Sequence, residues 1–113
     1  MSRDFRLYLE DMLAAIEKTL AYSADANSES LAEDTMRFDA ILFNLQIVGE
    51  AAKQVLENLR KQYPQIEWRK IAGLRDIIAH AYFGIEPMII WDVIQNHLPQ
   101  LRADLLLILQ DNT

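Results

Sequence analysis

The sequence contains no cysteine, and it has only 3 glycines and 3 prolines among its 113 residues. The absence of cysteine excludes disulfides, thiolate metal ligands and cysteine nucleophiles. The scarcity of glycine and proline, together with 51% hydrophobic residues, argues against a disordered or loop-rich chain. A chain of this length is expected to bury one hydrophobic core, so we predict a single domain over residues 1–113.

Long apolar runs are also missing. No uninterrupted run is longer than the one at residues 105–109, which is far shorter than the roughly 20 residues that a membrane-spanning helix needs. Near the N-terminus, Arg3, Asp4 and Arg6 interrupt any apolar run of the kind found in signal peptides. We therefore predict a cytoplasmic protein without a membrane segment.

Positive charge is in deficit overall, since the formal net charge is -6. Such a charge disfavours indiscriminate binding to phosphate backbones, so any nucleic-acid substrate is expected to be narrowly defined. The basic residues are nevertheless concentrated in residues 60–75, where Glu67 is the only acid. The basic members of this segment are Arg60, Lys61, Arg69, Lys70 and Arg75.

Apolar residues recur at three- and four-residue steps along the chain, which predicts helices throughout and no strands. We predict a first helix over residues 3–23 and a long second helix over residues 31–61. Ser30 and Glu33 have the spacing of a capping box at the start of this second helix. Pro64 should bias Tyr63 away from helical angles and so end the region.

The second half of the chain predicts two further helices. One begins near Trp68, buries Ile71, Leu74, Ile78 and Ala81, and stops at Gly84. The next opens with proline at its first position, at Glu86-Pro87, and breaks near Asn96 before Pro99. The predicted fold is therefore an all-α, antiparallel four-helix bundle whose last helix is broken near Pro99.

Four polar residues lie along the third predicted helix, in the segment GLRDIIAHAYFG at residues 73–84. Arg75 and Tyr82, seven residues apart, fall on nearly the same helical face, and Asp76 and His80, four apart, share another and can hydrogen-bond. Arg75 and His80 diverge by about 140° and are separated by roughly 7–8 Å along the axis. A site that uses both needs a long arginine reach, a distorted helix end or a second subunit.

The arrangement Arg75, four residues, His80, one residue, Tyr82 resembles the Arg-x4-His-x-Tyr signature of HepT-type HEPN proteins, the toxins of HepT–MntA toxin–antitoxin systems. The resemblance extends over nearly the whole chain. Its three blocks are NLQIVGEAAK, WRKIAGLRDIIAHAYFGI and IWDVIQNHLPQL, at residues 44–53, 68–85 and 90–101.

The resemblance implies a HEPN-type homodimer with endoribonuclease activity on RNA, tRNA being one candidate, in a type VII toxin–antitoxin system. Arg75 and His80 of both subunits would line a cleft at the dimer interface. RNA cleavage without a metal needs an acceptor for the 2′-OH proton, a donor for the leaving oxygen and positive charge on the phosphorane. His80 suits the proton transfers and Arg75 suits the phosphate.

The remaining roles follow from the same resemblance. Asp76 is a plausible auxiliary residue that orients His80, and Glu50 is a weaker candidate for a supporting acid. Gly49 before it would permit close helix packing. Tyr82 would receive AMP from ATP, transferred by an MntA-like minimal nucleotidyltransferase antitoxin, and the added nucleotide would block the Arg75 face.

Simpler interpretations remain open for each of these residues. Arg75 and Asp76 can be ordinary solvated charges, His80 a structural histidine, and Tyr82 a packed ring with an outward hydroxyl. The whole chain can also be a non-catalytic helical subunit that binds a nucleotidyltransferase and positions its substrate. We predict no metal site and no cofactor, because the two histidines lack ligand spacing and no glycine-rich phosphate loop exists.

Overall fold

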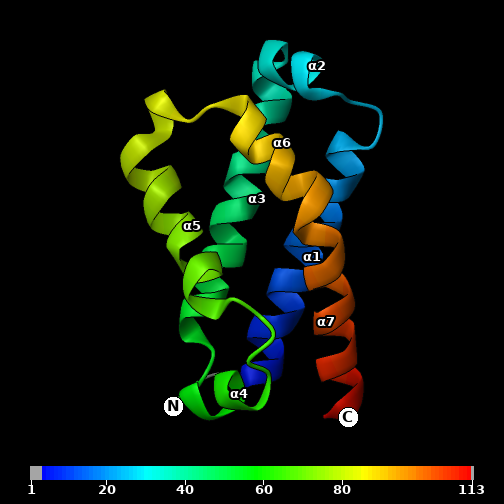
Figure 1. The fold of residues 1–113 in the computed structure, drawn as a ribbon, viewed down its shortest axis with the longest axis vertical. Coiled ribbons are helices and arrows are strands. Elements are labelled where there is room, and N and C mark those ends of the chain that lie inside the picture. The colour runs from blue at the N-terminus through cyan, green and yellow to red at the C-terminus, as the bar shows by residue number, and fades with distance from the viewer. Residues whose placement is uncertain (1–3, 113) are drawn as a thin grey trace.

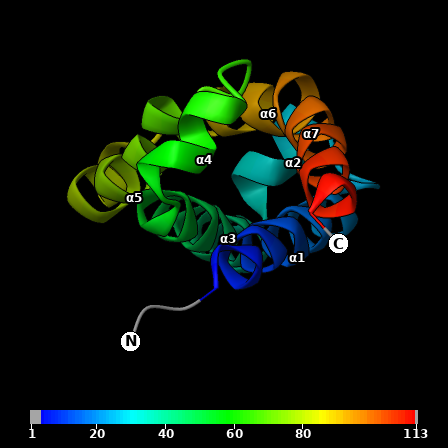
Figure 2. The same cartoon turned by 90° about the horizontal axis from the view of Figure 1, so that it is seen from below.

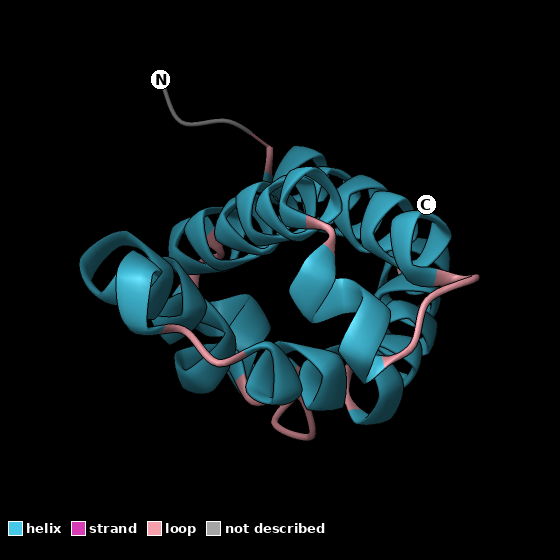
Figure 3. Ribbon diagram, turned by 90° about the horizontal axis from the view of Figure 1, so that it is seen from above, coloured by secondary structure: helices cyan, strands magenta, loops and turns pink. Residues whose placement is uncertain are grey.

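The computed structural model describes residues 4–112, and these residues form helices without any strand (Figure 3). Helices α1 (Phe5–Ser23), α3 (Thr35–Gln54) and α5 (Trp68–Ala81) alternate in direction, and α6 (Pro87–Asn96) with α7 (Leu98–Asp111) forms a fourth, antiparallel arm (Figure 1). The predicted all-α bundle is confirmed. No helix in this part of the chain is both long and apolar enough to cross a membrane.

Helix α3 holds the bundle together, because it packs against α1 on one side and α5 on the other (Figure 2). Helix α7 packs against α1 and α6. The largest fully buried side chains outside α5 are Leu9, Met12, Ile16, Leu31, Ile41, Leu42, Leu45, Val48, Ile94, Leu98, Leu105 and Ile108. Helix α5 buries only Trp68 and Ile78, so it lies at the side of the bundle.

The prediction of a single long helix over residues 31–61 is wrong. The chain forms three helices in its place, namely α2 (Ser28–Glu33), α3 and α4 (Glu57–Gln62). The first break is at Asp34, whose ψ of 88° is not helical. Its carboxylate accepts a hydrogen bond from the backbone N–H of Arg37 at 3.0 Å, so Asp34 caps the start of α3.

The second break is at Val55, which has the extended angles φ -69° and ψ 130°. Arg60 satisfies the carbonyl groups that this break exposes. Its Nε donates to the carbonyl oxygen of Val55 at 3.0 Å, and its Nη2 donates to that of Ala52 at 2.7 Å. Arg60, a member of the predicted basic segment, therefore caps the C-terminal end of α3.

Two smaller predictions about helix ends are also wrong. The capping box is formed by Asn27 and Ser30, not by Ser30 and Glu33: the N–H of Ser30 donates to Asn27 Oδ1 at 2.8 Å and that of Asn27 to Ser30 Oγ at 2.9 Å. Both pairs have a suitable spacing, and asparagine caps as well as serine. Helix α5 ends at Ala81 and not at the predicted Gly84. The chain then forms the 3-10 turn η1 (Tyr82–Gly84).

Other boundaries were predicted correctly. Pro87 occupies the first turn of α6, Tyr63 ends α4, and the last helical arm breaks at His97, between α6 and α7. The predicted buried stripe of α5 is only partly correct: Ile78 is buried, Ile71 and Leu74 are half-buried, and Ala81 is exposed.

Gly49 determines how closely α3 and α5 approach. A Cβ atom at Gly49 would lie 2.7 Å from the backbone nitrogen of Arg75 and 3.0 Å from the carbonyl oxygen of Ile71. These neighbours are backbone atoms of α5, so they move only if the helix moves. The expectation that a glycine here permits close packing is confirmed.

Replacing Gly49 by alanine is expected to lower the free energy of unfolding by about 1–3 kcal/mol, because the methyl group overpacks the helix interface. Gly73→Ala is the matched control, since a Cβ there meets nothing within 4 Å. That variant should gain about 0.5–1 kcal/mol from helix propensity alone. Urea denaturation of both variants measures the difference, and equal stabilities would contradict the packing account.

Candidate functional site

The candidate site lies along the contact between α3 and α5, which run antiparallel. The C-terminal half of α3 faces the middle of α5, and the N-terminal half of α3 faces the η1 turn. As a result Glu50 meets Arg75, and Asp39 meets Tyr82. Asp39 and Glu50 are eleven residues apart, which is close to three helical turns, so both project from the same face of α3.

Arg75 is held between two carboxylates. Its Nε lies 3.3 Å from Glu50 Oε2, and its Nη1 lies 3.3 Å from Asp76 Oδ1. The Arg75 side chain is still 44% exposed. A guanidinium group carries five N–H donors, more than these two contacts occupy. The geometry therefore fixes the direction of the arginine and leaves donors for an anion from solvent.

Asp76 is directed away from His80. Its carboxylate contacts Arg75 and also lies 3.6 Å from Lys53 Nζ on α3. The hydrogen bond from Arg75 and the positive charge of Lys53 lower the pKa of Asp76, so it remains ionised near neutral pH. The hydrogen bond expected between Asp76 and His80 is not formed.

His80 lies on the outward face of α5, near its C-terminal end, and its side chain is exposed. No hydrogen bond or ion pair joins it to another of the residues that the structure describes. Arg69 and Asp76 share this face, because they precede His80 by eleven and four residues. His80 is thus accessible to a large substrate.

Tyr82 belongs to the η1 turn and contacts α3. Its hydroxyl group donates a hydrogen bond to Oδ1 of Asp39, and its ring makes an edge-to-face contact with Phe83 at 5.2 Å between centroids. The hydrogen bond to Asp39 raises the pKa of Tyr82. The side chain is nevertheless 41% exposed, so a reagent can reach the phenol.

Two residues of this arrangement, Asp39 and Lys53, were not predicted to belong to it. The sequence carries a partial signal for Asp39, namely the eleven-residue spacing to Glu50. It carries no signal for which residues of α5 these side chains meet, because that depends on the register between two separate helices.

The basic segment at residues 60–75 is mostly neutralised by local contacts. Lys61 lies 3.6 Å from Glu57, and Lys70 lies 2.8 Å from Glu67, while Arg60 caps carbonyl groups. Among the described residues, Arg69 makes no ion pair. Arg69 is thus the member of the basic segment that lies on the exposed face of α5 without a neutralising contact.

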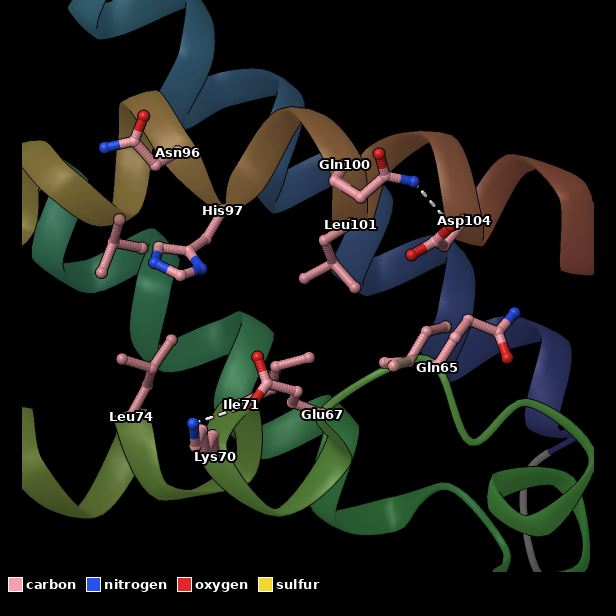
Figure 4. Close-up of a pocket in the computed structure, with 12 residues that line it drawn as sticks. Gln65, Glu67, Lys70, Ile71, Leu74, Asn96, His97, Gln100, Leu101 and Asp104 are labelled. Carbon is pink, nitrogen blue, oxygen red and sulfur yellow. Dashed lines mark hydrogen bonds and ion pairs between the residues drawn. The ribbon is translucent and has the colours of Figure 1, made fainter.

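A cavity of about 430 Å³ lies on the other side of α5, between that helix and the α6–α7 arm. Figure 4 shows Leu74 and Leu101 entering it from opposite sides, with His97 and the Lys70–Glu67 ion pair at its edge. This space explains why Ile71 and Leu74 are only half-buried. None of the predicted site residues lines it.

The acidic and histidine side chains described near the candidate site do not form a metal-binding cluster. Within residues 4–112, no three His, Cys, Asp or Glu side chains are grouped so that they can hold a metal ion. The carboxylates near Arg75 are bound to cationic side chains. The groups that remain available at this surface are the guanidinium of Arg75, the imidazole of His80, the phenol of Tyr82 and the carboxylate of Asp39.

Comparison with known proteins identifies relatives over nearly the whole chain. The protein named "Probable ribonuclease HepT" of Thermococcus cleftensis is 32% identical over 91% of this chain and 94% of its own length. "Putative RNase TTE0752" of Caldanaerobacter subterraneus subsp. tengcongensis is 33% identical over 93% of this chain and 94% of its own. No solved structure matches the chain.

One relative is about twice as long. "Gamma-glutamylcyclotransferase and putative RNase MJ0434" of Methanocaldococcus jannaschii is 30% identical over 98% of this chain, which spans 50% of that protein. The family described as "Ribonuclease HepT-like" matches residues 12–108, which include both helices of the candidate site. The chain belongs to the HepT-like ribonuclease family.

Proposed function

We propose that this protein is a metal-independent endoribonuclease that uses Arg75 and His80 and acts as the toxin of a type VII toxin–antitoxin system. The observation that carries the proposal is that His80 is exposed and the Arg75 side chain is 44% exposed on α5, in a member of the HepT-like family. Neither residue belongs to the core, to which α5 contributes only Trp68 and Ile78. Their side chains are therefore available for a substrate, with tRNA as one candidate class.

The two residues divide the chemistry of RNA cleavage. Arg75, oriented by Glu50 and Asp76, offers its remaining N–H donors to the non-bridging phosphate oxygens. His80 accepts the proton of the attacking 2′-OH or donates one to the leaving 5′-oxygen, since imidazole titrates near neutral pH. In this scheme Glu50 and Asp76 act as positioning residues.

A second copy of the chain completes the site in this proposal. One histidine cannot serve as base and acid in the same step, and the helix separates it from Arg75 by about 140° of rotation. The surface beside them is apolar: Ile77 is 58% exposed and Phe83 is 100% exposed. Phe43 on α3 is 63% exposed as well. Exposed apolar side chains of this kind are typical of a surface covered by another protein.

Tyr82 is the proposed point of control. An MntA-like nucleotidyltransferase would transfer AMP from ATP to its hydroxyl group. The family resemblance and the exposure of the phenol at the end of α5 support this assignment. The added phosphate and nucleoside would stand on the Arg75 face and oppose an RNA phosphate by bulk and by charge.

His80→Ala is expected to lower RNA cleavage on the order of 100-fold or more, because it removes the general acid–base group. Arg75→Ala should abolish growth arrest on expression of the chain alone. Two matched controls are available: His97→Ala removes the other histidine, and Arg102→Ala removes an arginine with a similar exposure of 43%. Harmless wild-type protein and intact RNA would favour the non-catalytic binding subunit instead.

A mixed dimer tests the contribution of the second copy. Arg75→Ala and His80→Ala chains, expressed separately, should both be inactive. Expressed together, they form heterodimers that retain one arginine and one histidine from different subunits, so the fraction of the RNA cleavage that a single proton donor or acceptor supports should return. Inactive heterodimers, verified by dual-tag purification, would argue that each subunit needs its own Arg75 and His80.

Modification of Tyr82 is tested by intact-protein mass spectrometry after incubation with ATP and an MntA-like nucleotidyltransferase. We expect a mass increase equal to one or more AMP groups, abolished in Tyr82→Phe. Tyr22→Phe is the matched control, because Tyr22 is also 41% exposed. Neutralised toxicity with an unmodified Tyr82 would reject the proposed control.

A further inference from the structure

The hydroxyl group of Tyr82 is bound by a carboxylate from a different helix. Asp39 lies in the first half of α3, 43 residues before Tyr82. Its carboxylate accepts a hydrogen bond from the hydroxyl group of Tyr82. Both side chains are exposed, so this contact is not required to satisfy a buried group. A partner enzyme approaching Tyr82 therefore meets the phenol and the carboxylate together.

The charge of Asp39 is not neutralised within the described chain. No lysine, arginine or histidine among residues 4–112 forms an ion pair with it, in contrast to Glu50 and Asp76. The carboxylate is thus not held by a cationic side chain. Its hydrogen bond also keeps the phenol protonated, as the raised pKa of Tyr82 indicates, so Tyr82 cannot react as a preformed phenolate.

We propose that Asp39 is the proton acceptor and the positioning residue for AMP transfer to Tyr82. This inference rests on the proposed function, in which a nucleotidyltransferase supplies ATP. The Oη of Tyr82 attacks the α-phosphorus of ATP, the bond from that phosphorus to the bridging oxygen breaks, and pyrophosphate leaves. The phenol proton passes to the carboxylate of Asp39 and then to solvent, so the substrate chain provides its own base.

The same contact is lost once the transfer is complete. The Oη atom of AMP-Tyr82 has no hydrogen to donate, and the new phosphodiester group carries a negative charge beside the Asp39 carboxylate. Repulsion between these groups separates the modified side chain from α3. The nucleotide is then directed away from Asp39, toward solvent and the α5 surface.

The test compares Asp39→Asn and Asp39→Ala with the wild-type chain in AMP transfer at saturating ATP. The asparagine side chain still offers an oxygen to the phenol but is not a base, so it separates proton acceptance from positioning. For Asp39→Asn we expect kcat to fall on the order of 100-fold with the KM for the protein substrate retained. Glu86→Gln is the control, because it removes the same charge four residues after Tyr82 without a contact to the phenol.

The outcomes distinguish this inference from the proposed function. Growth arrest by the Asp39 variants without the partner verifies that they fold and remain active. Wild-type kcat for Asp39→Asn, or an effect confined to KM, overturns the role of Asp39 as proton acceptor. If the wild-type chain itself receives no AMP, the proposed control by AMP transfer fails before the variants are compared.

Discussion

The backbone contact between Gly49 on α3 and Arg75 on α5 is the constraint on which the rest of the site depends. It sets both the distance and the register of the two helices, because the nearest atoms are main-chain atoms that cannot rotate away. The register brings Glu50 to Arg75, and three turns away it brings Asp39 to Tyr82. One small residue in the middle of a helix thus aligns two separate polar contacts.

The electrostatic balance of the site follows from this alignment. Arg75 and Lys53 contribute two positive charges, and Glu50 and Asp76 contribute two negative charges, so the contact is neutral as a group. A cation held between carboxylates is well oriented and only partly available. Under the proposed function, an RNA phosphate would bind the donors of Arg75 that these carboxylates do not use, and this restriction would favour a selective nuclease over a general one.

Much of the fold could be predicted from the sequence, and the failures have physical causes. The apolar spacing identified α1, α5 and the broken last arm, because a core needs a continuous apolar face on each helix. The same spacing continues through Asp34 and Val55, so it could not reveal that the long helix breaks there. Those breaks depend on a side-chain cap and on Arg60, whose contacts cross from one helix to the next.

The site shows the same limit. The motif pointed to Arg75, His80 and Tyr82 as candidates through local spacing. Helix geometry put Arg75 and Tyr82 on one face, and both side chains contact α3. It also suggested that Asp76 serves His80, whereas Lys53 and Arg75 hold that carboxylate. Asp39 was not predicted, because its partner Tyr82 lies 43 residues away in the sequence. The register between α3 and α5, which brings the two together, is a tertiary property.

The central claim is that His80 and Arg75 cleave RNA without a metal. The most direct test is incubation of purified chain with RNA in the presence of a chelator, followed by analysis of the fragment ends. The account predicts that wild-type protein produces fragments with 2′,3′-cyclic phosphate ends, whereas folded His80→Ala and Arg75→Ala proteins leave the RNA intact. RNA that remains intact with wild-type protein, or equal cleavage by all three proteins, would contradict it.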